Sequence, residues 1–214
     1  MGIAYNPKMI TDGLRFCTDS SNVKSYSGSG STQFDLITRS SSTDGVYANN
    51  PLLSGLSGFT GFCVLDITGT DTGYAYHPIS KWNTDTTDAS FVLYHFQQFN
   101  DNVRTNFLGW YANAGGSWSG LADWYDAGVG RYISTIQYGS SVGGQHWING
   151  TKYLTRSATR GNLGIGTGSI VVDGHITGRV GIHKVLSVSL YNRELSDSEI
   201  DMNHVVLKRR FGVT

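Results

Sequence analysis

The 214-residue sequence contains few charged side chains, and their signs are balanced. Asp, Glu, Lys and Arg make up 15% of the residues, against roughly 25% in an average soluble domain. The formal net charge is zero, with 16 basic and 16 acidic residues. This balance argues against a nucleic-acid-binding protein, because such a protein needs a basic surface that displaces counterions from phosphates.

Cysteines and long apolar runs are also scarce. Cys17 and Cys63 are the two cysteines, and each lies in an apolar run. We expect buried free thiols rather than a disulfide framework, although pairing of the two across strands stays open. No apolar run approaches the roughly 18 residues of a membrane-spanning helix. The start, MGIAYNPKMITDG, lacks a basic region followed by an apolar core, so we expect no signal peptide, no membrane partner and folding in a cytosol.

The residue sets typical of catalysis are missing from the sequence. Glu194 and Glu199 are the only glutamates, and both lie near the C-terminus, whereas glycoside hydrolases place two carboxylates on either side of one sugar bond. The six histidines lack the HxH and HExxH spacings of zinc sites, and no Gly-x-Ser-x-Gly elbow follows a strand. We therefore expect no catalytic residues and no enzymatic activity. A glycan-cleaving enzyme would require two aspartates from separate strands to converge.

Short runs rich in aromatic and β-branched residues recur between Gly, Asn, Asp and Ser, which indicates many strands. The expected strands cover 13–18, 59–67, 91–99, 104–111, 131–139 and 178–191. Asn149-Gly150 within QHWINGTKYL predicts a two-residue type I′ hairpin. The polar segments 25–50 and 77–90 are expected to be loops. With no interleaved helices, the pattern predicts one all-β domain over 1–214, an antiparallel β-sandwich.

One helix is expected at the C-terminus, over 196–210. Ser196 and Glu199 have the spacing of a capping box. Acidic residues in the first turns and Lys208, Arg209 and Arg210 in the last complement the helix dipole. Ile200, Leu207 and either His204 or Val205 would form its apolar face. A helix this short is marginal alone, so we expect it to dock on the sandwich and cover an exposed edge or end.

The two ends of the chain resemble a known family. TDGLRFCTDSSNVKSYSGSGSTQFDL (11–36) and VLSVSLYNRELSDSEIDMNHVVLKRRFG (185–212) are similar to the opening and closing segments of concanavalin A-like, laminin-G-like jelly-roll domains in the virions of tailed bacteriophages. HWINGTKYL and GNLGIGTG match intervening segments less specifically. The resemblance implies a two-sheet jelly roll. We also expect residues 1–12 to form an N-terminal arm. Fold and function separate easily, so the resemblance does not fix the activity.

A glycine-rich segment, GWYANAGGSWSGLADWYDAG (109–128), concentrates aromatic and polar side chains that suit a sugar site. Aromatic faces would stack on sugar CH groups, while Asn and Asp would bond to hydroxyls. The alternative is that these rings fill the core or a subunit interface, where Trp and Tyr are also enriched. The candidate carbohydrate-binding residues are Trp110, Tyr111, Asn113, Trp118, Asp123, Trp124, Tyr125 and Asp126.

Calcium is the one cofactor that the sequence leaves open. Asp66 and Asp71 lie in DITGTDTG, and Asp85 and Asp88 lie in NTDTTD. Carboxylates on turns suit Ca²⁺. Asp and Thr are also common in turns because their side chains bond to the local backbone.

Two functions follow from these observations. The first is a non-enzymatic structural protein of a phage virion, such as a capsid decoration, cement or fibre component. It would be present in many copies or as a homo-oligomer and would contact other virion proteins. The second is a carbohydrate-binding module that attaches to host or environmental glycans, with many weak sites acting together.

Overall fold

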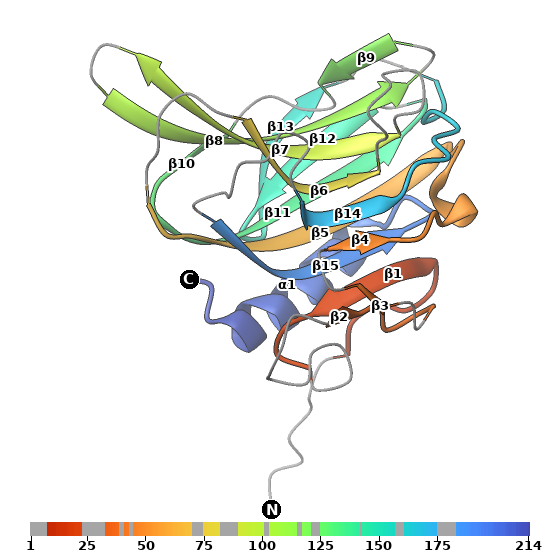
Figure 1. Ribbon diagram of the computed structural model, residues 1–214, viewed down its shortest axis with the longest axis horizontal. Coiled ribbons are helices and arrows are strands. Elements are labelled where there is room, and N and C mark those ends of the chain that lie inside the picture. Colours follow the sequence, from red (N-terminus) through yellow and green to blue (C-terminus); the bar gives the residue numbers. More distant parts are fainter. Residues whose placement is uncertain are drawn as a thin grey trace, which may run out of the picture.

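Two antiparallel sheets face each other in the computed structural model, and a helix lies against the outer side of one of them (Figure 1). The structure describes residues 8–22, 33–38, 41–42, 45–69, 75–81, 90–100, 103–114, 117–120, 125–141, 143–156, 161–174 and 183–214. This arrangement confirms the expected all-β sandwich with one C-terminal helix. Within those ranges, no helix has the length and apolarity needed to cross a membrane.

The strands divide between the sheets as follows, within the described parts of the chain. The first sheet runs in the order β1 (Leu14–Asp19), β15 (His183–Tyr191), β5 (Gly58–Ile67), β11 (Gly130–Gly139), β12 (Gly143–Ile148) and β13 (Thr151–Arg156). The second runs β10 (Tyr125–Ala127), β8 (Val103–Ala114), β7 (Phe91–Asn100), β6 (Ala75–Lys81), β14 (Ile170–Gly174) and β4 (Val46–Tyr47), with β9 (Ser117–Gly120) also paired to β8. β2 (Gln33–Phe34) and β3 (Ser41–Ser42) pair separately, and a short 3-10 helix covers Pro51–Leu53.

The six expected strands are all present, and β15 begins at His183, after residues that lie outside the described ranges. The expected loops are partly wrong, because β4 lies within 25–50 and β6 extends into 77–90. In β6, the pairing with β7 shifts register between Tyr76 and Ile79, around Pro78. A proline that cannot donate to a ladder is tolerated at such an irregularity, and it hides the strand in the sequence.

The hairpin between β12 and β13 has the expected turn. Asn149 and Gly150 have φ angles of 50° and 80°, as a type I′ turn requires of both central residues. The Asn149 side chain also accepts a hydrogen bond from the backbone N–H of Ile133, at 2.8 Å. The turn is therefore fixed both by its own conformation and by a contact to β11.

Strand β5 is covered on both faces, which explains its continuous apolar sequence. Cys63 and Leu65 belong to the core between the two sheets, whereas Phe62 and Val64 belong to a second cluster beneath the C-terminal helix. Cys17 is in that second cluster. Both cysteines are buried and neither forms a disulfide, as expected, and they belong to different clusters.

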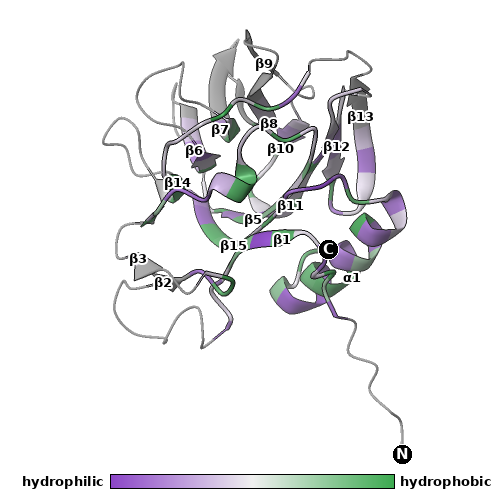
Figure 2. Cartoon of the chain, turned by 90° about the vertical axis from the view of Figure 1, so that its right-hand side faces the viewer, coloured by the Kyte–Doolittle hydropathy of each residue, from purple (hydrophilic) through white to green (hydrophobic). Residues whose placement is uncertain are grey.

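Helix α1 (Asp197–Phe211) packs on the outer face of the first sheet, where its apolar side chains cluster with those of β1, β5, β11 and β12. Figure 2 marks the apolar positions along α1 in green. The expectation that it would cover an edge or end of the sandwich is therefore wrong. Ile200, His204, Leu207 and Phe211 are buried, while Val205 is 45% exposed. The helix is needed because Phe62 and Val64 of β5 and Ile133 of β11 place apolar side chains on this outer face.

Candidate functional site

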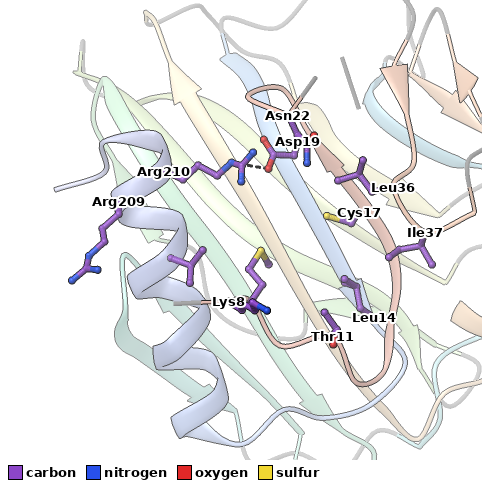
Figure 3. Close-up of a pocket in the computed structure, with 12 residues that line it drawn as sticks. Lys8, Thr11, Leu14, Cys17, Asp19, Asn22, Leu36, Ile37, Arg209 and Arg210 are labelled. Carbon is purple, nitrogen blue, oxygen red and sulfur yellow. Dashed lines mark ion pairs between the residues drawn. The ribbon is translucent and has the colours of Figure 1, made fainter. Parts of the chain in front are cut away.

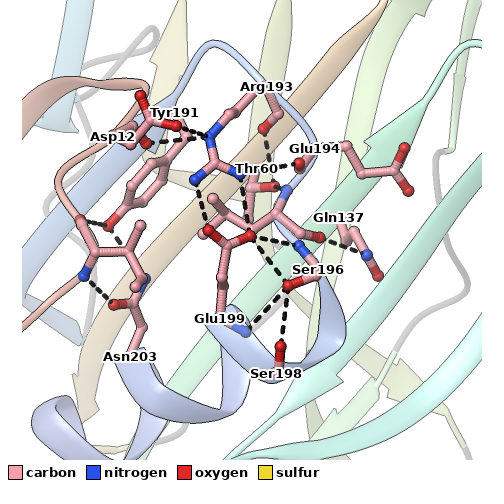
Figure 4. Close-up of polar contacts among 12 residues, drawn as sticks. Asp12, Thr60, Gln137, Tyr191, Arg193, Glu194, Ser196, Ser198, Glu199 and Asn203 are labelled. Carbon is pink, nitrogen blue, oxygen red and sulfur yellow. Dashed lines mark hydrogen bonds and ion pairs between the residues drawn. The ribbon is translucent and has the colours of Figure 1, made fainter.

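The C-terminal motif that carries the family resemblance forms a network that attaches α1 to the sandwich (Figure 4). Arg193 donates two hydrogen bonds to Glu199, at 3.0 and 2.6 Å, and pairs with Asp12 at 3.0 Å. Glu199 also accepts the backbone N–H of Ser196, which completes the expected capping box. The hydrogen bonds from Arg193 and from Ser196 lower the pKa of Glu199 to about 2. Glu199 is therefore a structural carboxylate rather than a proton donor.

The same network attaches the N-terminal segment to the helix. Tyr191 donates its hydroxyl hydrogen to the carbonyl of Ile10 at 2.8 Å. Asn203 accepts the N–H of Ile10 at 2.9 Å and donates to the Tyr191 hydroxyl at 3.1 Å. Residues 8–12, the described part of the expected arm, are thus joined to α1, and the motif's polar residues are used to close the fold.

Trp110 is a correction to the expected sugar site. Its side chain is fully buried between the sheets, and its indole N–H donates to the hydroxyl of Ser134 at 3.0 Å. A ring enclosed in this way cannot stack on a sugar. The alternative interpretation, in which the aromatic residues of this segment fill the core, is right for Trp110.

A Ser–His contact lies at the same place in the core. The Ser134 hydroxyl is 2.9 Å from Nε2 of His146, which is the spacing of a nucleophile and its base. Both residues are fully buried, and Ser134 already accepts the hydrogen bond from Trp110. Substrate has no access to this pair, so we assign it a structural role.

The other expected sugar-binding residues are described to different extents. Tyr111 is partly buried on β8. Asn113 lies on β8 and Trp118 on β9, and the structure describes the backbone but not the side chain of each. Asp123 and Trp124 lie outside the described residues. Tyr125 and Asp126 lie on β10, where Tyr125 is partly exposed and Asp126 is exposed.

Tyr125 belongs to a group of three tyrosines at one side of the sandwich, which we call the tyrosine cluster: Tyr125, Tyr132 and Tyr153. The ring of Tyr125 meets that of Tyr153 edge-on, with centroids 4.9 Å apart and planes at 88°. Its centroid lies 6.1 Å from that of Tyr132. β10 and β13 are the outermost strands of their sheets in the described pairing, so the cluster bridges the two sheets where the sandwich opens to solvent.

The environment of the tyrosine cluster is partly desolvated and bears a negative charge. Burial raises the pKa of Tyr125, and the nearby Tyr132, Tyr153 and Asp126 raise it further. Tyr153 remains 45% exposed and Val129 60% exposed. Exposed aromatic surface next to hydroxyls and a carboxylate is able to stack on a pyranose ring and bond to its hydroxyl groups.

The sequence analysis did not identify Tyr132 or Tyr153 as candidate binding residues. For Tyr132, the alternation of side chains along the strand indicated which face it would occupy. Tyr132 shares its side of β11 with Ile136 and Tyr138, which belong to the inner core. It lies near the start of the strand, where the core ends. Tyr153 lies in the second strand of the predicted hairpin, and only the three-dimensional arrangement of the sheets brings it to β10.

Most of the residues proposed to bind calcium lie outside the part of the chain that the structure describes. Asp71, Asp85 and Asp88 lie outside the described residues. Asp66 is described, and it pairs with Arg131 at 3.2 Å between Oδ2 and Nε. Within the described ranges, no three His, Cys, Asp or Glu side chains are grouped so as to hold a metal. Calcium binding therefore stays a prediction.

No protein-family model and no curated protein matches the sequence. Solved structures with a similar fold include Trypanosoma rangeli sialidase, with 14% identity, a TM-score of 0.58 and coverage of 95% of this chain and 34% of that one. The binding domain of botulinum neurotoxin serotype D is 15% identical, with a TM-score of 0.55 and coverage of 81% and 44%. A structure titled for the dependence of botulinum neurotoxin type C cell entry on two ganglioside molecules is 11% identical, with a TM-score of 0.57 and coverage of 91% and 51%.

The chain thus spans about a third to a half of the length of these structures. At such low identities the likeness concerns the fold: this chain is similar to β-sandwich domains found in a sialidase and in neurotoxin binding domains.

Proposed function

We propose that this chain is a non-enzymatic glycan-binding module whose ligand stacks on the tyrosine cluster. The observation that carries the proposal is the partly exposed set of Tyr125, Tyr132 and Tyr153 beside Asp126. The similarity to a sialidase and to a toxin whose structure title names gangliosides supports glycans over other ligands. Binding without catalysis agrees with the structural use of Glu199 and with the burial of Ser134 and His146.

A glycan array followed by calorimetry on the best glycan tests the proposal. Tyr153→Ala is expected to weaken binding about fivefold, because one stacking ring contributes on the order of 1 kcal/mol. Tyr153→Phe keeps the ring and is expected to stay within about threefold of the original protein. Met202→Ala is the matched control, since Met202 is equally exposed but lies on α1.

Two results would overturn this assignment. One is an array with no glycan bound by folded protein. The other is a Tyr153→Ala variant that binds as tightly as the original chain. Hydrolysis of the bound glycan would contradict the non-enzymatic part alone.

The structural role in a phage virion has less support than glycan binding. Its basis is the sequence resemblance at the two ends of the chain. The described residues of the C-terminal motif join the helix, the N-terminal segment and the sheet. A shared fold is therefore enough to explain the similarity. The structures named above are not virion proteins. A place on a particle stays a prediction, and mass spectrometry of purified particles, with the copy number, would test it.

A further inference from the structure

A groove runs between strand β1, helix α1 and residues 36–37, on the outer side of the first sheet (Figure 3). We call it the β1–α1 groove. Its volume is about 640 Å³, which lies within the range of small-molecule sites, roughly 300–1,000 Å³. Its wall on the helix side includes Val206, and the opposite wall includes Leu36 and Ile37.

The floor of the groove is apolar. Leu14 and Cys17 of β1 line it, and Met9 closes it from the N-terminal segment. Burial raises the pKa of the Cys17 thiol to about 11, so the thiol is neutral at physiological pH and behaves as a small apolar group. Ile37 remains 43% exposed. These surfaces gain free energy when an apolar chain displaces water from them.

One end of the groove presents a cation with spare hydrogen-bond donors. Arg210 pairs with Asp19 through Nε, at 2.8 Å from Oδ2. Asp19 also accepts the N–H of Ser21 at 2.9 Å. In the described part of the chain this is the one polar contact of the Arg210 guanidinium, so its two terminal amino groups retain their donors. The two terminal amino groups of a guanidinium can donate parallel hydrogen bonds to the two oxygens of a carboxylate.

The charges around the groove favour an anion. Among the described residues that line it, Lys8, Arg209 and Arg210 are basic and Asp19 alone is acidic. Arg209 points outward at the rim, whereas Arg210 turns toward Asp19 over the groove (Figure 3). This excess of positive charge is local, because the whole chain has no net charge. An anion with an apolar tail is therefore complementary to both parts of the groove.

We propose that the β1–α1 groove binds a free medium-chain fatty acid, with its carboxylate on Arg210 and its chain along the apolar floor. From Asp19 to Leu14 the strand extends for roughly 16 Å, at about 3.3 Å per residue, which accommodates a saturated chain such as that of laurate. The site is separate from the tyrosine cluster, so it does not depend on the glycan proposal.

Calorimetry with laurate below its micelle concentration tests this site on the full chain. We expect saturable binding of one laurate and no binding of dodecyltrimethylammonium, which has the same tail and the opposite charge. Val206→Trp fills the groove and is expected to weaken laurate binding at least tenfold. Val205→Trp is the matched control, since Val205 immediately precedes Val206 in the helix, is 45% exposed and is not among the groove-lining residues.

A second variant tests the charge at the end of the groove. The double substitution Asp19→Asn with Arg210→Gln replaces the ion pair with neutral groups of similar size, which avoids leaving one buried charge unpaired. We expect laurate binding to fall about tenfold in this variant, with circular dichroism unchanged.

Several outcomes would overturn the fatty-acid site. These are no saturable laurate binding, equal binding of laurate and dodecyltrimethylammonium, or unchanged laurate binding by Val206→Trp. Binding to phosphatidylglycerol vesicles without binding of free laurate would identify a membrane surface as the occupant instead.

Discussion

His204 is a histidine that the fold holds neutral beneath α1. Its Nε2 lies 3.2 Å from the Thr135 hydroxyl oxygen, and its ring packs edge-on against Phe62. Burial lowers the pKa of His204 to about 4, with a smaller contribution from Lys208. Because the unfolded chain binds this proton near pH 6.5 and the folded chain does not, stability is fully present above about pH 6.5 and falls as the pH drops toward 4.

The expected loss from His204 alone is on the order of 3 kcal/mol at most across that window. Urea unfolding at pH 7, 5.5 and 4.5 measures it. His204→Gln keeps a polar group near Thr135 but does not titrate, so its stability should change much less over the same range. If both proteins lose stability equally, His204 is not the group responsible. Glu199 adds its own loss only below about pH 4.5, since its pKa is lowered.

Gly150 is a residue whose conformation matters more than its contacts. Its φ is 80°, and a β-carbon there would lie 3.6 Å from the nearest atom, Cβ of His204. Space is therefore available, and the cost of Gly150→Ala comes from the left-handed backbone, on the order of 1 kcal/mol. Thermal unfolding measures it, with the exposed neighbour Thr151→Ala as control. A stability equal to that of the original protein would mean that the turn relaxes to another type.

At the scale of the element, α1 contributes to stability through the face that it buries. Leu207→Ala removes a side chain that is 1% exposed, and we expect a loss of about 3 kcal/mol. Val205→Ala, two residues earlier on the same helix, removes a side chain that is 45% exposed and should change stability by no more than about 0.5 kcal/mol. Urea unfolding of the two variants compares them directly. Equal, small losses would mean that α1 does not pack on the sheet in solution.

The elements differ in how well the sequence predicts them. Long strands such as β5 and β11 were predicted closely, because both are rich in apolar, β-branched and aromatic residues. β4 has two residues and β6 contains a proline at a register shift, so neither leaves such a pattern. The capping box and the Asn149-Gly150 turn were also predicted, since each depends on residues close together in sequence.

At the scale of the whole molecule, prediction fails where the sheets determine which residues meet. Tyr125 and Asp126 were recognised as candidates because they lie in an aromatic segment. Tyr153 was missed because it approaches Tyr125 only when the outermost strands of the two sheets face each other. Trp110 was misassigned for the related reason that its direction, toward the core, depends on the strand's register in the sandwich.

The balanced charge of the whole chain leads to a last prediction, for glycan binding. With zero formal net charge, the protein has little long-range attraction for a charged ligand, and stacking on Tyr153 does not depend on ionic strength. Calorimetry of the best array glycan should therefore give a Kd that changes less than about twofold between roughly 0.05 and 0.5 M salt. A steep loss of affinity with salt would show that charged side chains dominate the binding. The glycan site would then have to be sought at basic residues such as Lys8 and Arg209 rather than at the tyrosine cluster.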